Sequence, residues 1–183
     1  ASVEPAAPVA VVAPGPPVPT AVDVDRSLPH PVPVDRDAVA LVVGIERYGG
    51  KVPPVTFARR DAQAMQAYMR DVFGVEPENQ IVLLDDQATK GALQTAFEGR
   101  LGSLVEPGKS RVYVYFAGHG APDMKSKTAF LVPYDGDPQY PAASCYAASA
   151  AYEALGRLKA KDVTVMLDAC FTGDAARSET PQA

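Results

Sequence analysis

Two residues with complementary chemistry each follow an apolar stretch of the chain. His119 lies in the string FAGHG, and Cys170 lies in the string DACFTG. A thiolate is a strong nucleophile, and an imidazole can take the thiol proton and later protonate a leaving amine. The glycines on both sides of His119 let the backbone turn sharply and let a substrate approach closely. Each residue alone also has a simpler role, as a small buried side chain or a turn residue, but together they predict nucleophilic attack on a carbonyl carbon.

The surrounding elements must bring these residues together. Apolar runs predict strands over 38–45, 81–84, 111–117 and 163–167, and a short strand over 129–132. Helical periodicity predicts helices over 60–73, from Thr89 to about Leu104, and over 148–158. This alternation predicts an α/β fold: a mostly parallel sheet with helices on both faces, in three αβα layers. If strands 111–117 and 163–167 are neighbours, His119 and Cys170 emerge at one edge of the sheet.

One helix can be described in more detail. In 60–73 the predicted buried stripe contains Ala64, Met65, Tyr68, Met69 and Val72, and Gly74 is expected to end the helix.

Residues 1–34 differ in composition from the rest. They hold half of the 18 prolines of the chain, and proline fixes φ and removes a hydrogen-bond donor. This segment is predicted to be an extended, polyproline-like linker or tail, and docking of part of it as an edge strand is an alternative. The domain that carries the chemistry is assigned to residues 35–183.

Composition excludes some classes of function. The net charge of −5 and the pI of about 5.0 argue against a nucleic-acid partner. No run of about 18 apolar residues exists, so no membrane span is expected. Two cysteines, Cys145 and Cys170, do not make a disulfide framework. The chain begins with Ala1, which is consistent with removal of a signal peptide or a tag, and an exported or periplasmic location is favoured slightly over a cytoplasmic one.

With these motifs the sequence resembles the caspase and metacaspase superfamily of clan CD cysteine peptidases, and the caspase-like proteins of bacteria in particular. The strings YFAGHG and DACFTG carry the resemblance, supported by ALVVGI at 40–45, Arg60-Asp61-Ala62 and LLDD at 83–86. In caspases the histidine lies about 50 residues before the cysteine, and His119 lies 51 residues before Cys170.

The resemblance implies a cysteine endopeptidase with no metal in its chemistry. Cys170 would attack the scissile carbonyl, and His119 would act as acid and base. The backbone amides of Gly120 and Cys170 would form the oxyanion hole.

The same resemblance suggests the substrate. Metacaspase-like enzymes hold Arg or Lys before the cleaved bond with acidic residues. Asp61 matches the acidic position that opens their first helix. Asp168 lies two residues before Cys170, so alternation puts both side chains on the same side of the strand, and both carboxylates are expected to face the pocket. Asp61 also has a simpler role as a helix-start carboxylate. Ala117 and Ala58 stand where the family often has Ser and Cys. Because Arg59 and Arg60 lie nearby, a pocket of the caspase type, in which arginines bind an aspartate side chain, is an alternative.

The resemblance also implies further structure and partners. Family members continue after the cysteine with another helix and more strands, so a separate small fragment or a partner is expected to complete the sheet, beside a protein or peptide substrate. A caspase-like interaction module with weak or no catalysis is the alternative. No cofactor is predicted, with calcium activation, known for some metacaspases, as the alternative. Asp85-Asp86 and Asp135 with Asp137 lack the spacing of a calcium loop, so these carboxylates are expected to be solvated loop charges.

Overall fold

The core of the molecule is a four-stranded parallel sheet. The computed structural model describes residues 32–123 and 127–170. Its strands are β1 (Ala38–Gly44), β2 (Gln80–Leu84), β3 (Arg111–Ala117) and β7 (Asp162–Asp168). They are ordered β2-β1-β3-β7, and all three neighbouring pairs are parallel. The predicted α/β class and the adjacency of the two strands that precede His119 and Cys170 are therefore confirmed.

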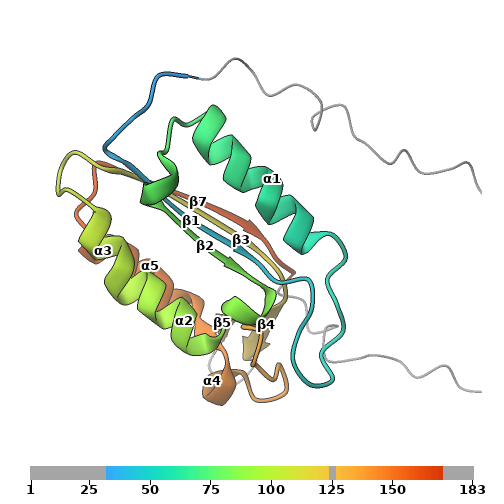
Figure 1. Cartoon of the computed structure of the whole chain (residues 1–183). Coiled ribbons are helices and arrows are strands. Elements are labelled where there is room, and N and C mark those ends of the chain that lie inside the picture. Colours follow the sequence, from blue (N-terminus) through green and yellow to red (C-terminus); the bar gives the residue numbers. More distant parts are fainter. Residues whose placement is uncertain (1–31, 124–126, 171–183) are drawn as a thin grey trace, which may run out of the picture.

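Helices cover both faces of this sheet (Figure 1). One face is covered by α1 (Ala58–Asp71). The other is covered by α2 (Lys90–Thr95), the π-helix η4 (Ala96–Arg100), α3 (Leu101–Leu104) and α5 (Ala148–Arg157). Thr89 caps this composite helix as predicted, since its hydroxyl accepts a hydrogen bond from Ala92 N at 3.2 Å.

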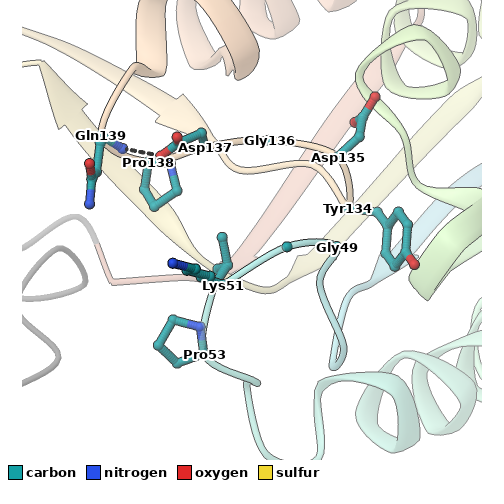
Figure 2. Close-up of a pocket in the computed structure, with 11 residues that line it drawn as sticks. Gly49, Lys51, Pro53, Tyr134, Asp135, Gly136, Asp137, Pro138 and Gln139 are labelled. Atoms are coloured by element: carbon teal, nitrogen blue, oxygen red, sulfur yellow. Dashed lines mark hydrogen bonds between the residues drawn. The ribbon is translucent and has the colours of Figure 1, made fainter.

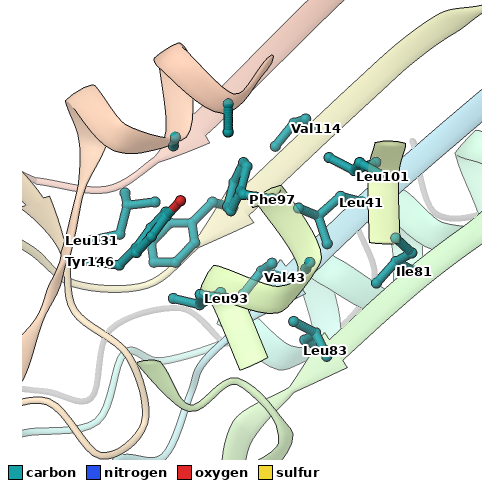
Figure 3. Close-up of a cluster of buried hydrophobic side chains, with 14 of the residues drawn as sticks. Leu41, Val43, Ile81, Leu83, Leu93, Phe97, Leu101, Val114, Leu131 and Tyr146 are labelled. Carbon is teal, nitrogen blue, oxygen red and sulfur yellow. The ribbon is translucent and has the colours of Figure 1, made fainter. Parts of the chain in front are cut away.

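Alternating side chains of the strands form two cores. Leu41 and Val43 of β1 pack toward α2, α3 and α5 with Val114 of β3 (Figure 3). Phe116 of β3 belongs to the same core. The alternate side chains of β1 and β3, including Val42, Tyr115 and Ala117, point to the other face and pack toward α1. All seven residues of β1 are buried, which is the burial expected of a central parallel strand.

Helix α1 approaches the sheet very closely at one point. A Cβ at Gly44 would lie 2.3 Å from the Cβ of Ala62 and 2.7 Å from the Ala58 carbonyl oxygen. The absence of a side chain at Gly44 therefore fixes where the first turns of α1 sit against the end of β1.

The predicted buried stripe of α1 was partly wrong. Met69 is buried as expected, but the other buried residues are Ala58 and Ala62, while Ala64 and Tyr68 are only half-buried. The helix begins two residues earlier than predicted, and its close packing on Gly44 selects the small side chains.

A second sheet, which is antiparallel, was predicted only in part from the sequence. It contains β4 (Gly120–Asp123), β5 (Thr128–Leu131) and β6 (Tyr146–Ala147), in the order β4-β5-β6. Only β5 was predicted. A short helix, α4 (Pro141–Ser144), precedes β6, and 3₁₀ turns η2 (Pro77–Asn79) and η3 (Asp85–Gln87) flank β2.

Most of the predicted N-terminal linker lies outside the described residues. The described part begins at Val32, whose N–H donates to the Asp71 carbonyl at 3.3 Å, and Asp35 forms an isolated parallel bridge with Val75. The Asp35 carboxylate also pairs with Arg111 at 2.7 Å. Residues 32–35 thus contact the end of α1 and the start of β3. In the described part of the chain, no helix is long and apolar enough to cross a membrane.

Candidate active site

The register between β3 and β7 aligns the two candidate catalytic residues. Arg111 pairs with Asp162, and the pairing continues without a break to Ala117 and Asp168. Every pair is 51 residues apart, which is also the separation of His119 and Cys170. Gly118 N donates to the Asp168 carbonyl at 3.2 Å, one step beyond the strands. His119 and Cys170 therefore lie at equivalent positions, each two residues beyond the carboxyl end of its strand.

His119 is held by three hydrogen bonds. Its backbone N–H donates to the Tyr48 hydroxyl at 2.6 Å, and its carbonyl accepts from Val132 N at 3.0 Å. Its Nε2 lies 2.9 Å from the Pro53 carbonyl oxygen. Because a carbonyl oxygen only accepts, Nε2 must carry the proton of a neutral ring. Nδ1 is then the nitrogen that can accept a proton, and it has no hydrogen-bond partner among the described residues.

Tyr48 was not identified from the sequence as a site residue. Its ring centroid lies 5.1 Å from that of His119, and the rings are tilted by 40°. Burial raises the pKa of Tyr48 far above its usual range, although the hydrogen bond from His119 N opposes this. A Cβ at Gly118 would lie 2.7 Å from the Tyr48 hydroxyl. The glycine before His119 thus makes room for the tyrosine that contacts it.

The loop that carries Tyr48 and Pro53 is fixed by Asp85. One carboxylate oxygen of Asp85 accepts from Glu46 N at 2.9 Å and from Arg47 N at 3.1 Å, and the other pairs with Arg59 at 2.7 Å. Burial acts to raise the pKa of Asp85, but these hydrogen bonds outweigh it and hold the pKa below its usual range. Asp85 is 8% exposed, so it is a buried anchor and not the solvated loop charge that we expected.

The two cysteines have opposite environments. Cys145 is buried, and burial raises the pKa of its thiol. Cys170 is exposed at the sheet edge. Both thiols are free, and only the accessible one is placed to react with a peptide.

The predicted specificity residues lie near one phenol. Asp168 pairs in register with Ala117, whose side chain faces α1, and Asp61 lies on α1. Burial raises the pKa of Tyr115 to about 12, and the charges of Asp168 and Asp61 contribute. Both carboxylates therefore act on the α1 face of the sheet near Tyr115.

The two arginines considered as alternatives have other contacts. Arg59 pairs with Asp85 at 2.7 Å. The guanidinium of Arg60 lies 4.9 Å from the centre of the Phe57 ring, and its Nε is 4.0 Å from the Asp61 carboxylate.

The backbone at Gly120 also has a defined orientation. Val132 N bonds to the His119 carbonyl, and Gly120 is paired with Leu131 across β4 and β5. Hydrogen-bonded and non-hydrogen-bonded pairs alternate along antiparallel strands. The N–H of Gly120 therefore points away from β5 and can donate to another group.

A cavity of about 590 Å³ is lined in part by Pro53, the residue that contacts His119, and Figure 2 shows the residues around it. One wall is residues 49–53, which end at the proline that contacts His119, and the other is residues 134–139. Gly49 N joins the two loops by donating to the Tyr134 carbonyl at 2.8 Å. Within the described ranges, no group of three His, Cys, Asp or Glu side chains is arranged to hold a metal ion.

Comparison with solved structures supports the fold. The chain is similar to the crystal structure of protein GSU0716 from Geobacter sulfurreducens, with a TM-score of 0.59 and 21% sequence identity. The similarity covers 74% of this chain and 51% of that protein, so this chain spans about half the length of its structural relative. A search of curated proteins finds no match.

Comparison with protein families is more specific. The sequence model described as the caspase domain matches residues 37–182, a range that includes both strands, His119 and Cys170. The match extends over most of the chain and agrees with the parallel sheet and its covering helices. The chain therefore belongs to the caspase-domain family of cysteine peptidases.

Proposed function

We propose that the protein is a cysteine endopeptidase that cleaves peptide bonds with His119 and Cys170, after an Arg or Lys residue. The observation that carries the proposal is the unbroken β3–β7 register, which aligns the two residues at adjacent strand ends. Membership of a cysteine peptidase family supports the class of reaction.

In the proposed reaction, the sulfur of Cys170 attacks the scissile carbonyl carbon while the thiol proton passes to Nδ1 of His119. The tetrahedral oxyanion is stabilised by N–H groups of Gly120 and Cys170. The C–N bond then breaks, His119 protonates the leaving amine, and a thioester remains on Cys170. Water, deprotonated by His119, hydrolyses the thioester and restores the thiol.

The hydrogen bonds of His119 suit this role. The Pro53 carbonyl holds the ring with Nε2 protonated and Nδ1 free, and Tyr48 and Val132 fix its backbone. An orienting partner on the far nitrogen keeps the imidazole in the tautomer that accepts the nucleophile's proton.

Asp168 and Asp61 are proposed to bind the basic side chain of the substrate. Their shared influence on Tyr115 supports a common negative region on the α1 face, and carboxylates bind a guanidinium through bidentate hydrogen bonds. The ion pair of Arg59 with Asp85 disfavours the alternative in which Arg59 binds an aspartate side chain.

We also propose that a further chain segment or partner covers the outer edge of β7. In the described residues β7 pairs with β3 only, and Val163 and Leu167 are 41% and 38% exposed. An uncovered strand edge with exposed apolar side chains is a ready pairing surface.

A panel of fluorogenic Arg, Lys and Asp peptides tests the reaction, with Cys170→Ala and the matched variant Cys145→Ala. We expect turnover of the Arg and Lys substrates by the wild type and Cys145→Ala, and none by Cys170→Ala. Asp168→Asn should weaken the preference for Arg. Equal turnover by the wild type and Cys170→Ala would contradict the peptidase assignment, and turnover only after Asp would contradict the basic pocket.

A further inference from the structure

We infer that the cavity between residues 49–53 and 134–139 binds the part of the substrate that follows the cleaved bond, and that Lys51 selects an acidic side chain there. The inference rests on the proposed peptidase function. It adds a second recognition site, on the opposite side of the scissile bond from Asp168 and Asp61.

The order of strands gives the direction of the bound peptide. Cys170 follows β7, His119 follows β3, and the loop with Pro53 follows β1, which is the next strand in the sheet. The acyl carbon must be bonded to Cys170, and the leaving nitrogen must come within hydrogen-bond reach of His119. A peptide that continues past His119 in this direction reaches the loop after β1.

The cavity lies where that path leads. Pro53 lines it and also accepts the hydrogen bond from His119 Nε2. Its volume of about 590 Å³ falls in the usual range of ligand sites, about 300–1,000 Å³. The lining includes Gly49, Gly50 and Gly136, and glycine lets a bound backbone approach closely.

Among the charged side chains of the cavity, Lys51 alone has no partner within the described residues. Asp135 accepts from Lys90 N at 2.8 Å, and its carboxylate is turned away from Lys51 (Figure 2). Asp137 accepts from Gln139 N at 2.8 Å. Lys51 is exposed and makes no hydrogen bond or ion pair among the described residues. An acidic side chain of a bound substrate would give Lys51 a partner for an ion pair.

The position along the substrate follows from spacing. Lys51 lies two residues before Pro53, and an extended peptide advances about 3.3 Å per residue. Because Pro53 contacts His119 and Lys51 lies further along the same cavity wall, we expect the acidic residue beyond the first position after the cleaved bond, and the second and third positions are tested.

The test uses internally quenched peptides that differ only in Glu, Gln or Lys at those two positions, together with an aminocoumarin substrate that has no residue after the bond. For the wild type, kcat/KM should be about fivefold higher with Glu than with Lys. Lys51→Glu should reverse this preference and leave the aminocoumarin substrate within twofold of wild type. Lys161→Glu is the matched control, since it makes the same charge change next to the opposite end of β7. It should change kcat/KM for neither the quenched peptides nor the aminocoumarin substrate.

A second measurement does not depend on turnover. Binding of the Glu peptide to Cys170→Ala, followed by fluorescence anisotropy, should weaken about fivefold when Lys51→Glu is added. An unchanged Glu-to-Lys preference in Lys51→Glu, or an equal loss on the aminocoumarin substrate, would overturn the inference. Failure of the wild type to cleave either substrate would instead overturn the proposed function, and this inference with it.

Discussion

The two strands that end at the candidate catalytic residues differ in how the chain supports them. β3 is an interior strand, and the residue that follows it, His119, is held by Tyr48, Pro53 and Val132. β7 has one described neighbour, and most of its residues are exposed, as is Cys170. The described part of the chain thus holds the candidate acid-base residue firmly. It leaves the candidate nucleophile after a strand whose outer edge pairs with no other described strand.

The largest expected effect on activity comes from replacing His119, the residue that is held by three hydrogen bonds. His119→Ala should lower kcat on an Arg substrate by about 10³-fold, because it removes the group that takes and returns the proton. His30→Ala is the matched control, since His30 is the other histidine of the chain. Equal losses in both variants would contradict the assignment.

Asp85 supports His119 indirectly, because it fixes the loop that carries Tyr48 and Pro53. Asp85→Ala should lower the free energy of unfolding by about 3 kcal/mol, because it leaves Arg59 and two loop amides without their buried partner. Urea denaturation measures this loss. Asp86→Ala, an exposed neighbour, should change stability little.

The contribution of Asp85 to the free energy of unfolding also depends on pH. The pKa of Asp85 is lower in the folded state, so its stabilisation is present above the pKa of the unfolded chain and is lost as pH falls through the folded value. Asp85→Ala should therefore flatten the acid side of the stability profile. An unchanged profile would show that the anchor carries no charge-dependent stability.

A matched pair of valines compares the two strands directly. Val112 of β3 and Val163 of β7 are register partners, 1% and 41% exposed. Val112→Ala should cost about 2 kcal/mol through a buried cavity, and Val163→Ala less than about 0.5 kcal/mol. Equal costs would mean that β7 is covered in solution as well as β3 is.

A smaller effect on activity than that of His119→Ala should come from Tyr48, the tyrosine that contacts His119. Tyr48→Phe removes only the hydroxyl that accepts from His119 N. The loss of one buried hydrogen bond, about 1.4 kcal/mol, should lower kcat about tenfold with little change in KM. Tyr134→Phe, in the neighbouring cavity wall, is the control. A loss in KM alone would argue for a role in substrate binding instead.

Sequence patterns predicted the main strands because buried parallel strands are continuously apolar, as in β1 and β3. They predicted His119 and Cys170 because both stand at strand ends with distinctive neighbours. They could not predict Tyr48, Pro53 or the Asp85 anchor, since these contacts join residues 26 to 71 positions apart. β4 was missed because its four residues, GAPD, contain glycine and proline and form a strand only by pairing with β5.

Alkylation of Cys170 by iodoacetamide at pH 7 tests the proposed His119–Cys170 dyad without a substrate, because the rate depends on how far His119 activates the thiol. Peptide mass spectrometry distinguishes Cys170 from the buried Cys145 of the same molecule. We expect His119→Ala to slow alkylation of Cys170 about tenfold, while Cys145 stays unmodified in the native protein. Equal rates of Cys170 alkylation with and without His119 would contradict the dyad.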